Sequence, residues 1–218
     1  TDLMVEINAI IGEYVSVEDL SSEKSGKFNI SDIDFDILAR EFAKVKHKNL
    51  LLKDLEEVIK VKLGAMLAAN PSRMDYYERY QAIIQGYNAE QDRATIEKTF
   101  EELKKLVDDL STEEQRYVRE GFENDDELTV YDLLFKEDLS KNDIKKIKEV
   151  AADLLKKVKA KISELDYWTD KQETKAAVDN LIRDTLWAEL PECYDELSIS
   201  AYRQKIYEYM YTRYGNIA

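Results

Sequence analysis

The sequence predicts an all-α protein, a multi-helix bundle of about eight helices with no significant sheet. Hydrophobic residues recur with helical spacing along almost the whole chain, and no segment sustains the alternation that is typical of strands. Only 6 Gly and 2 Pro interrupt the 218 residues, and Lys, Glu, Leu, Ala and Asp dominate the composition. A chain of this length buries a sizeable core, either in one large domain or in two small ones.

The helices expected in the first half of the chain follow from apolar stripes and from residues that begin or end a helix. An amphipathic stretch covers residues 2–14, and a serine-rich, loop-like segment follows it. Ser31 and Asp32 cap the next helix, and a further one covers residues 50–69. Ser72 then caps a tyrosine-rich helix, whose apolar stripe consists of Tyr76, Tyr80, Ile83, Ile84 and Tyr87.

The second half continues the helical pattern. The expected stretches are 92–110, 112–121, 125–135, 140–165, 169–190 and 198–214. Most of them begin at a side chain that can accept a hydrogen bond from the first backbone amides; these residues are Thr112, Asp125 or Asp126, Ser140, Thr169 and Ser198. Three ends are marked by glycine or proline, at Gly121, Pro191 and Gly215.

We expect a single helical domain over residues 1–218. Residues 1–31 would form an N-terminal helix and loop, residues 32–190 the main helical bundle, and residues 191–218 a C-terminal docking helix. The chain opens with Thr1 rather than with a methionine, and we expect it to be a piece of a longer protein.

The charge distribution argues against autonomous DNA binding. The net charge is −14, and an acidic surface repels phosphate. Residues 141–161 reverse this locally, because they hold eight lysines and three acids, a net +5 that leaves −19 for the rest. A solvated helix face is the simpler interpretation. The alternative is a face, including Lys145, Lys148, Lys156 and Lys159, that meets the DNA backbone or an acidic partner inside an assembly.

The last predicted helix carries two apolar stripes, although a surface helix needs only one. The first stripe consists of Ile199, Tyr202, Ile206, Tyr209 and Met210. The second consists of Tyr207, Tyr211 and Tyr214. This second stripe either covers a neighbouring helix of the same domain or binds a partner, since exposed tyrosine is enriched at interfaces.

No catalytic or metal-binding constellation is evident in the sequence. Glycine-rich phosphate loops are missing, and no glutamate is followed by a histidine three residues on, as di-iron bundles require. The lone His47 lies among lysines, where a solvated helix face is the simpler interpretation. The acidic-x-Lys tripeptides at Asp143 and Glu173 fall in helical patterns and are rejected as nuclease motifs. We therefore expect no catalytic, cofactor-binding or metal-binding residue in this chain.

The single cysteine, Cys193, excludes an internal disulfide and is expected to be a semi-buried loop residue. A reducing compartment, the cytoplasm, is the simplest expectation for such a chain. The longest uncharged run, residues 63–72, is far too short to cross a bilayer, so we expect no membrane partner.

One block is more specific than the rest. Asn70-Pro71-x-Arg73-x-Asp75, followed by Tyr76-Tyr77-Glu78, joins a helix stop to a helix start. It resembles a block at a helix junction in the C-terminal helical region of the R (motor) subunit of type I restriction-modification enzymes. Segments similar to the family's next ones follow in order at residues 92–97, 100–103, 119–122 and 168–191. Lys175 departs from this pattern, since a typical member has Arg there.

The resemblance implies a non-catalytic region of a larger enzyme, an ATP-dependent, site-specific deoxyribonuclease whose nuclease and DNA translocase domains use ATP and Mg²⁺. It also implies that the region helps to attach the motor to the methyltransferase core of modification and specificity subunits. The expected partners are the rest of the R subunit and that core, with DNA met only within the full complex. The alternative is a stand-alone helical regulator or enzyme with a small-molecule pocket among the tyrosines.

Overall fold

The computed structural model describes residue 42 and residues 48–89, 93–165 and 167–215. These residues form eight α-helices and one 3₁₀-helix, and they contain no strand, so the all-α prediction is confirmed. The helices predicted at residues 2–14 and from Ser31, together with His47, lie outside the described residues. None of the helices in the described part of the chain is both long and apolar enough to span a membrane.

The chain divides into two compact units. The first contains the described residues up to Leu67 together with Arg73–Glu114, and the second contains Ala68–Ser72 and the chain from Gln115 onward. The expected division into residues 1–31, 32–190 and 191–218 has no boundary at residues 114–115. A single domain over the whole length stays a prediction.

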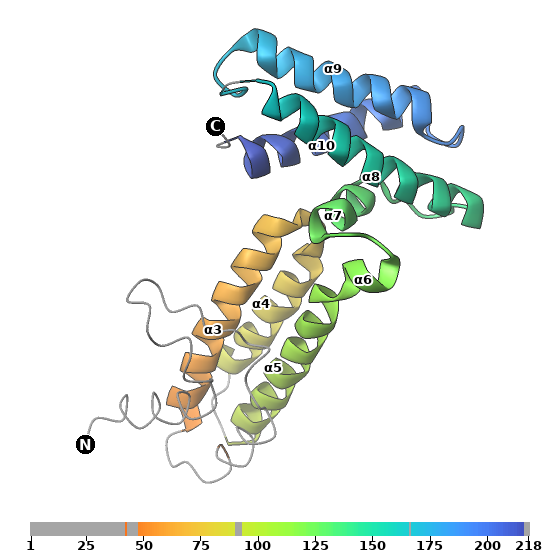
Figure 1. Ribbon diagram of the computed structural model, residues 1–218. Helices are drawn as coiled ribbons and strands as arrows, with labels where there is room; N and C mark the ends of the chain where they lie inside the picture. Colours follow the sequence, from red (N-terminus) through yellow and green to blue (C-terminus); the bar gives the residue numbers. More distant parts are fainter. Residues whose placement is uncertain (1–41, 43–47, 90–92, 166, 216–218) are drawn as a thin grey trace. The chain divides into compact units, whose positions relative to one another are not determined.

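The first unit contains α3 (Lys48–Ala69) up to Leu67, together with α4 (Met74–Ala89) and α5 (Arg93–Glu114) (Figure 1). All three helices contribute to one apolar cluster, in which Ile59, Leu103 and Leu110 are fully buried. The predicted stripe of α4 faces this cluster, because Tyr80 is buried and its other members are partly buried against the same core.

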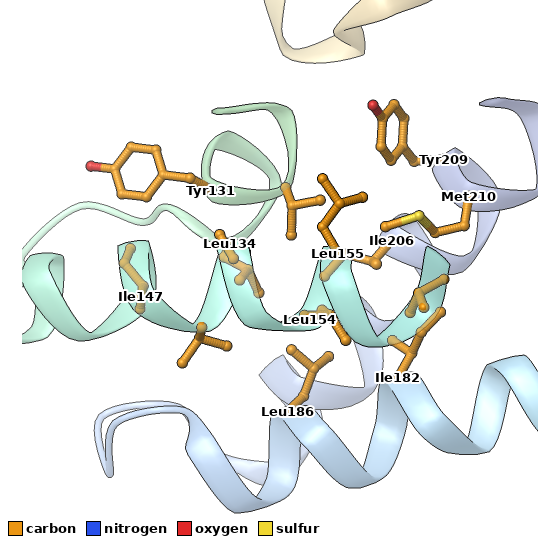
Figure 2. Packing of buried hydrophobic residues seen from close by; sticks show 14 of the residues in the cluster. Tyr131, Leu134, Ile147, Leu154, Leu155, Ile182, Leu186, Ile206, Tyr209 and Met210 are labelled. Atoms are coloured by element: carbon orange, nitrogen blue, oxygen red, sulfur yellow. The ribbon is translucent and has the colours of Figure 1, made fainter. Parts of the chain in front are cut away.

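The second unit consists of α6 (Arg116–Glu120), α7 (Asp125–Leu134), α8 (Lys141–Ser163), α9 (Gln172–Glu189) and α10 (Glu196–Tyr214), besides residues 68–72. The long helix α8 packs against both α7 and α9, and α10 packs against α9 and α7. Figure 2 shows how apolar side chains of these helices converge, with Leu154 and Leu155 on α8, Leu186 on α9 and Met210 on α10.

Several predicted helix ends are confirmed. The helix α3 stops at Ala69, and a 3₁₀ turn (Pro71–Arg73) separates it from α4. Ser140 caps α8 in a capping box, since its Oγ accepts from the amide of Asp143 at 3.1 Å and the Asp143 carboxylate accepts from the amide of Ser140 at 3.2 Å. Gly121 ends α6 with a φ of 84°, a left-handed conformation that glycine adopts without strain.

Other predicted caps are wrong, because a neighbouring side chain takes the role. The Asn70 Oδ1 atom, rather than Ser72, accepts from the first free amide at the start of the 3₁₀ turn, the amide of Ser72, at 3.1 Å. Asn124 caps α7 in place of Asp125 or Asp126, since its Oδ1 accepts from the amide of Glu127 at 3.0 Å. These neighbours have the same kind of acceptor oxygen, so sequence alone does not separate them.

Three further starts also differ from the prediction. Thr112 lies inside α5 and donates its hydroxyl to the carbonyl of Asp108 at 2.9 Å, so it opens no helix. The helix α9 begins at Gln172, not Thr169, and Asp195 rather than Ser198 caps α10 by accepting from the Ser198 amide at 2.8 Å.

Candidate functional site

Trp168 organises the part of the second unit to which the sequence assigns a docking role. It lies in the connection between α8 and α9 and is fully buried. Its indole Nε1 donates to the carbonyl oxygen of Tyr214 at 2.9 Å. Tyr207 and Tyr211 of α10 meet the indole edge-on, with ring centroids 6.1 and 5.7 Å from its own. The end of α10 is therefore fastened to this connection by a hydrogen bond and by two aromatic contacts.

The three tyrosines of the second stripe lie at different depths. Tyr214 is buried, with 7% of its surface exposed, and Tyr207 is partly buried against the apolar cluster. Tyr211 is 42% exposed, and the Lys175 ammonium lies 5.9 Å from its ring centroid. Of this stripe, Tyr211 thus has the largest surface available to a partner, and partner binding by the stripe stays a prediction.

The Asp126 carboxylate joins three helices of the second unit. It accepts hydrogen bonds from the hydroxyls of Tyr209 and Tyr214 on α10, and from Lys159 of α8 at 3.4 Å. The Arg213 guanidinium lies 3.2 Å away as well. Burial opposes ionisation of this carboxyl, but the hydrogen bonds from Tyr214 and Tyr209 and the two cations outweigh it and hold the pKa of Asp126 below its usual value.

Two of the four lysines proposed to face DNA are occupied within the second unit. Lys148 donates to the backbone carbonyl and the carboxylate of Glu120, at 2.9 and 2.7 Å, and its hydrogen bond keeps the pKa of Glu120 below the usual value. Lys159 contacts Asp126 and lies 5.0 Å from the ring centroid of Tyr214. These two side chains have internal ion-pair partners that a local sequence pattern does not reveal.

The other two proposed lysines lie on the surface. The side chain of Lys145 is 80% exposed and lies 3.9 Å from Glu149 one turn away, while Lys156 is exposed. Lys141 and Lys146 of the same helix are also exposed. A basic surface on α8, if one is used, is therefore formed by these four residues, which we call the exposed lysine set.

Sequence reasoning missed most of the exposed large apolar side chains. In the second unit these are Val118, Phe135, Tyr167, Trp187 and Leu197, besides Tyr211. Trp187 is 52% exposed on α9, whose buried positions include Val178, Ile182 and Leu186. Because these buried residues are four positions apart, residue 187 lies outside their stripe. Helical periodicity alone therefore predicts that Trp187 is exposed.

The block that includes Asn70 and Arg73 is used internally. Asn70 is fully buried in the second unit, where its Nδ2 donates to the Asp132 carboxylate at 2.7 Å. Burial raises the pKa of Asp132, and the hydrogen bond from Asn70 and the charge of Arg116 offset only part of that effect. In the first unit, Arg73 is buried and its Nε donates to Glu113 at 3.0 Å.

The structure also places the single cysteine of the chain. Cys193 is exposed, so the expectation of a semi-buried cysteine is wrong; it lies in the loop that precedes α10. Among the residues that the structure describes, no group of three or more His, Cys, Asp and Glu side chains is placed to hold a metal ion.

Comparison with known proteins identifies the family. A family model described as "Type I restriction enzyme HindI endonuclease subunit-like, C-terminal" matches residues 6–208, which is most of the chain. Searches of curated proteins and of solved structures gave no significant match. The family match confirms the resemblance seen at Asn70-Pro71-x-Arg73 and in the segments that follow it. The chain belongs to the type I restriction enzyme HindI endonuclease subunit-like family and represents its C-terminal region.

Proposed function

We propose that the chain is a non-catalytic helical assembly domain. In this proposal it couples the ATP-dependent translocase and endonuclease of its parent subunit to a methyltransferase core of modification and specificity subunits in the cytoplasm. The observation that carries the proposal is the family match over residues 6–208. ATP and Mg²⁺ would be bound by other parts of the parent. A stand-alone regulator with a small-molecule pocket is the rival function, and membership of a restriction-enzyme subunit family counts against it.

The exposed aromatic residues of the second unit support an assembly role. Trp187 on α9 is 52% exposed and Tyr211 on α10 is 42% exposed. Large aromatic side chains are enriched at interfaces, where a few of them supply most of the binding free energy. Both residues lie on long helices that are held by the apolar cluster, so each is presented on a rigid element.

The assembly proposal predicts that Trp187→Ala or Tyr211→Ala weakens capture of the complete R subunit by its methyltransferase core. Truncating an interface aromatic removes about 2 kcal/mol or more of binding free energy, which corresponds to an affinity loss of about thirtyfold. Titration of each variant against tagged core, followed by calorimetry or interferometry, measures this loss.

Glu208→Ala is the matched control for this experiment, since Glu208 is an exposed residue of α10 without an aromatic ring. Its affinity for the core should stay at the wild-type value. Equal affinities for wild type and both aromatic variants would rule out this surface as the contact. Failure of the wild-type subunit to bind the core would rule out the assembly role itself.

The isolated chain is expected to bind DNA weakly and only at low salt. The net charge of −14 repels phosphate, and five of the eight lysines of α8 lie within 4 Å of acidic side chains. Fluorescence anisotropy with a labelled duplex should show no micromolar binding at physiological salt. Changing the exposed lysine set (Lys141, Lys145, Lys146 and Lys156) to glutamate should abolish any low-salt binding. Lys148→Glu alone should instead lower the stability of the second unit, because it breaks the contacts with Glu120. Micromolar binding at physiological salt would contradict the argument from charge.

A further inference from the structure

Polar contacts hold residues Ala68–Ser72 in the second unit. None of the five residues belongs to the apolar cluster of that unit, and three of them are exposed. Asn70 is the exception, with no exposed surface. Its Nδ2 donates to Asp132 Oδ2 at 2.7 Å, and its Oδ1 accepts from the amide and the hydroxyl of Ser72, at 3.1 and 2.7 Å. The turn is thus closed on itself and attached to α7 through one carboxylate.

The residues of α6 and α7 that surround this turn also contribute polar contacts. The Arg116 guanidinium of α6 donates to the second oxygen of Asp132, and the Ser72 hydroxyl lies 3.2 Å from the first. One turn earlier on α7, the Thr129 hydroxyl lies 3.2 Å from the carbonyl oxygen of Ala69 and 2.9 Å from that of Asp125. Asp132 is therefore the acceptor that Asn70, Ser72 and Arg116 share, and its side chain is 10% exposed.

We propose that Asp132 is a latch that controls local opening of residues 68–72. When a segment opens, its hydrogen bonds to the protein are replaced by hydrogen bonds to water, so each one adds only a small net stabilisation. The apolar cluster of α7 to α10 loses its buried surface only when the unit unfolds, and such regions open at a much higher free energy than exposed polar segments. Release of the Asp132 contacts therefore frees the connection between α3 and α4 while the core of the second unit stays folded.

The latch assigns a structural role to the block by which the chain resembles its family. The Asn70 side chain is fully buried and bonded to Asp132 and Ser72, so it is not left to bind DNA or a protein partner. Pro71 restricts the turn through its fixed φ. This inference is independent of the assembly proposal, because it concerns the motion of the chain alone.

Hydrogen exchange measured by mass spectrometry on the intact 218-residue chain tests the latch. In Asp132→Ala, amide exchange in peptides that cover residues 68–74 should accelerate at least about tenfold, the effect of losing one to two hydrogen bonds. Peptides from the middle of α8 should keep their wild-type rates. Asn70→Ala should show the same pattern, and the double variant should exchange little faster than the faster single one.

Asp184→Ala is the control, since Asp184 is an exposed residue of α9 that pairs with its neighbour Arg183. This change should leave the exchange of residues 68–74 at the wild-type rate. The proposal is overturned if neither Asp132→Ala nor Asn70→Ala accelerates exchange there. It is also overturned if peptides of α8 accelerate by the same factor, since opening would then be global unfolding rather than a local event.

Discussion

Trp168→Ala is expected to lower the free energy of unfolding by about 3–5 kcal/mol, the range for large-to-small changes of a buried aromatic residue. The indole is fully buried, and its Nε1 satisfies the carbonyl of Tyr214 at the end of α10. Its loss would leave a cavity beneath Tyr207 and Tyr211, both of which contact it edge-on. Urea denaturation followed by circular dichroism measures the loss.

The second tryptophan of the chain provides the matched control. Trp187 is 52% exposed, so Trp187→Ala should change the free energy of unfolding by no more than about 0.5 kcal/mol. Trp168→Phe separates the two contributions of the indole, because it keeps an aromatic ring and removes the hydrogen bond to Tyr214. It should cost less than Trp168→Ala. Equal stability of Trp168→Ala and Trp187→Ala would show that Trp168 is not a core residue in solution.

The same residue bears on how the tyrosine stripe of α10 is used. A ring that covers a buried indole contributes to folding, and a ring that also has exposed surface can contribute to binding. Tyr207 is partly buried against the core, whereas Tyr211 contacts Trp168 and is still 42% exposed. Packing and docking are therefore not exclusive for Tyr211, and its truncation should be judged by a melting curve and a binding assay together.

Local sequence patterns predicted the fold class and several of the boundaries. Pro71 lacks the amide that would continue α3, and Ser140 with Asp143 forms a complete capping box, so both signals are contained within a few residues. The apolar stripe of α8 likewise follows from spacing alone, because Ile147, Leu154 and Val158 recur at helical intervals and all three are buried. Such features need no information about the rest of the chain.

The candidate sites depended on partners that are distant in sequence, and sequence patterns did not reveal these. Lys159 lies with charged residues of its own helix, but its ion-pair partner Asp126 is 33 residues away. Tyr214 belongs to the second stripe of α10, for which the sequence leaves both packing and partner binding open, and its hydroxyl donates to the same carboxylate 88 residues away. Charge and periodicity show which side chains could contact a partner molecule. Only the packing of the helices shows which of these side chains already form contacts within the protein.

Arg73→Ala is expected to destabilise the first unit by about 3–5 kcal/mol, the range for removing one partner of a buried ion pair. The Arg73 Nε lies 3.0 Å from Glu113, and the two side chains are 4% and 5% exposed. Desolvating two charges is costly, so the pair is tolerated only while both partners are present. Thermal or urea unfolding of Arg73→Ala and Glu113→Ala should show losses of similar size.

Arg79→Ala is the matched control, because Arg79 forms a second ion pair with α5, to Asp109 at 2.7 Å, with side chains 43% and 39% exposed. Water screens this pair, so its removal should cost no more than about 1 kcal/mol. The double variant Arg73→Met with Glu113→Leu should recover most of the stability lost by either truncation, since it removes both buried charges and keeps apolar volume. Arg73→Ala and Arg79→Ala could instead lower the free energy of unfolding equally. The Arg73–Glu113 pair would then be hydrated in solution, and Arg73 would not be a buried residue of the first unit.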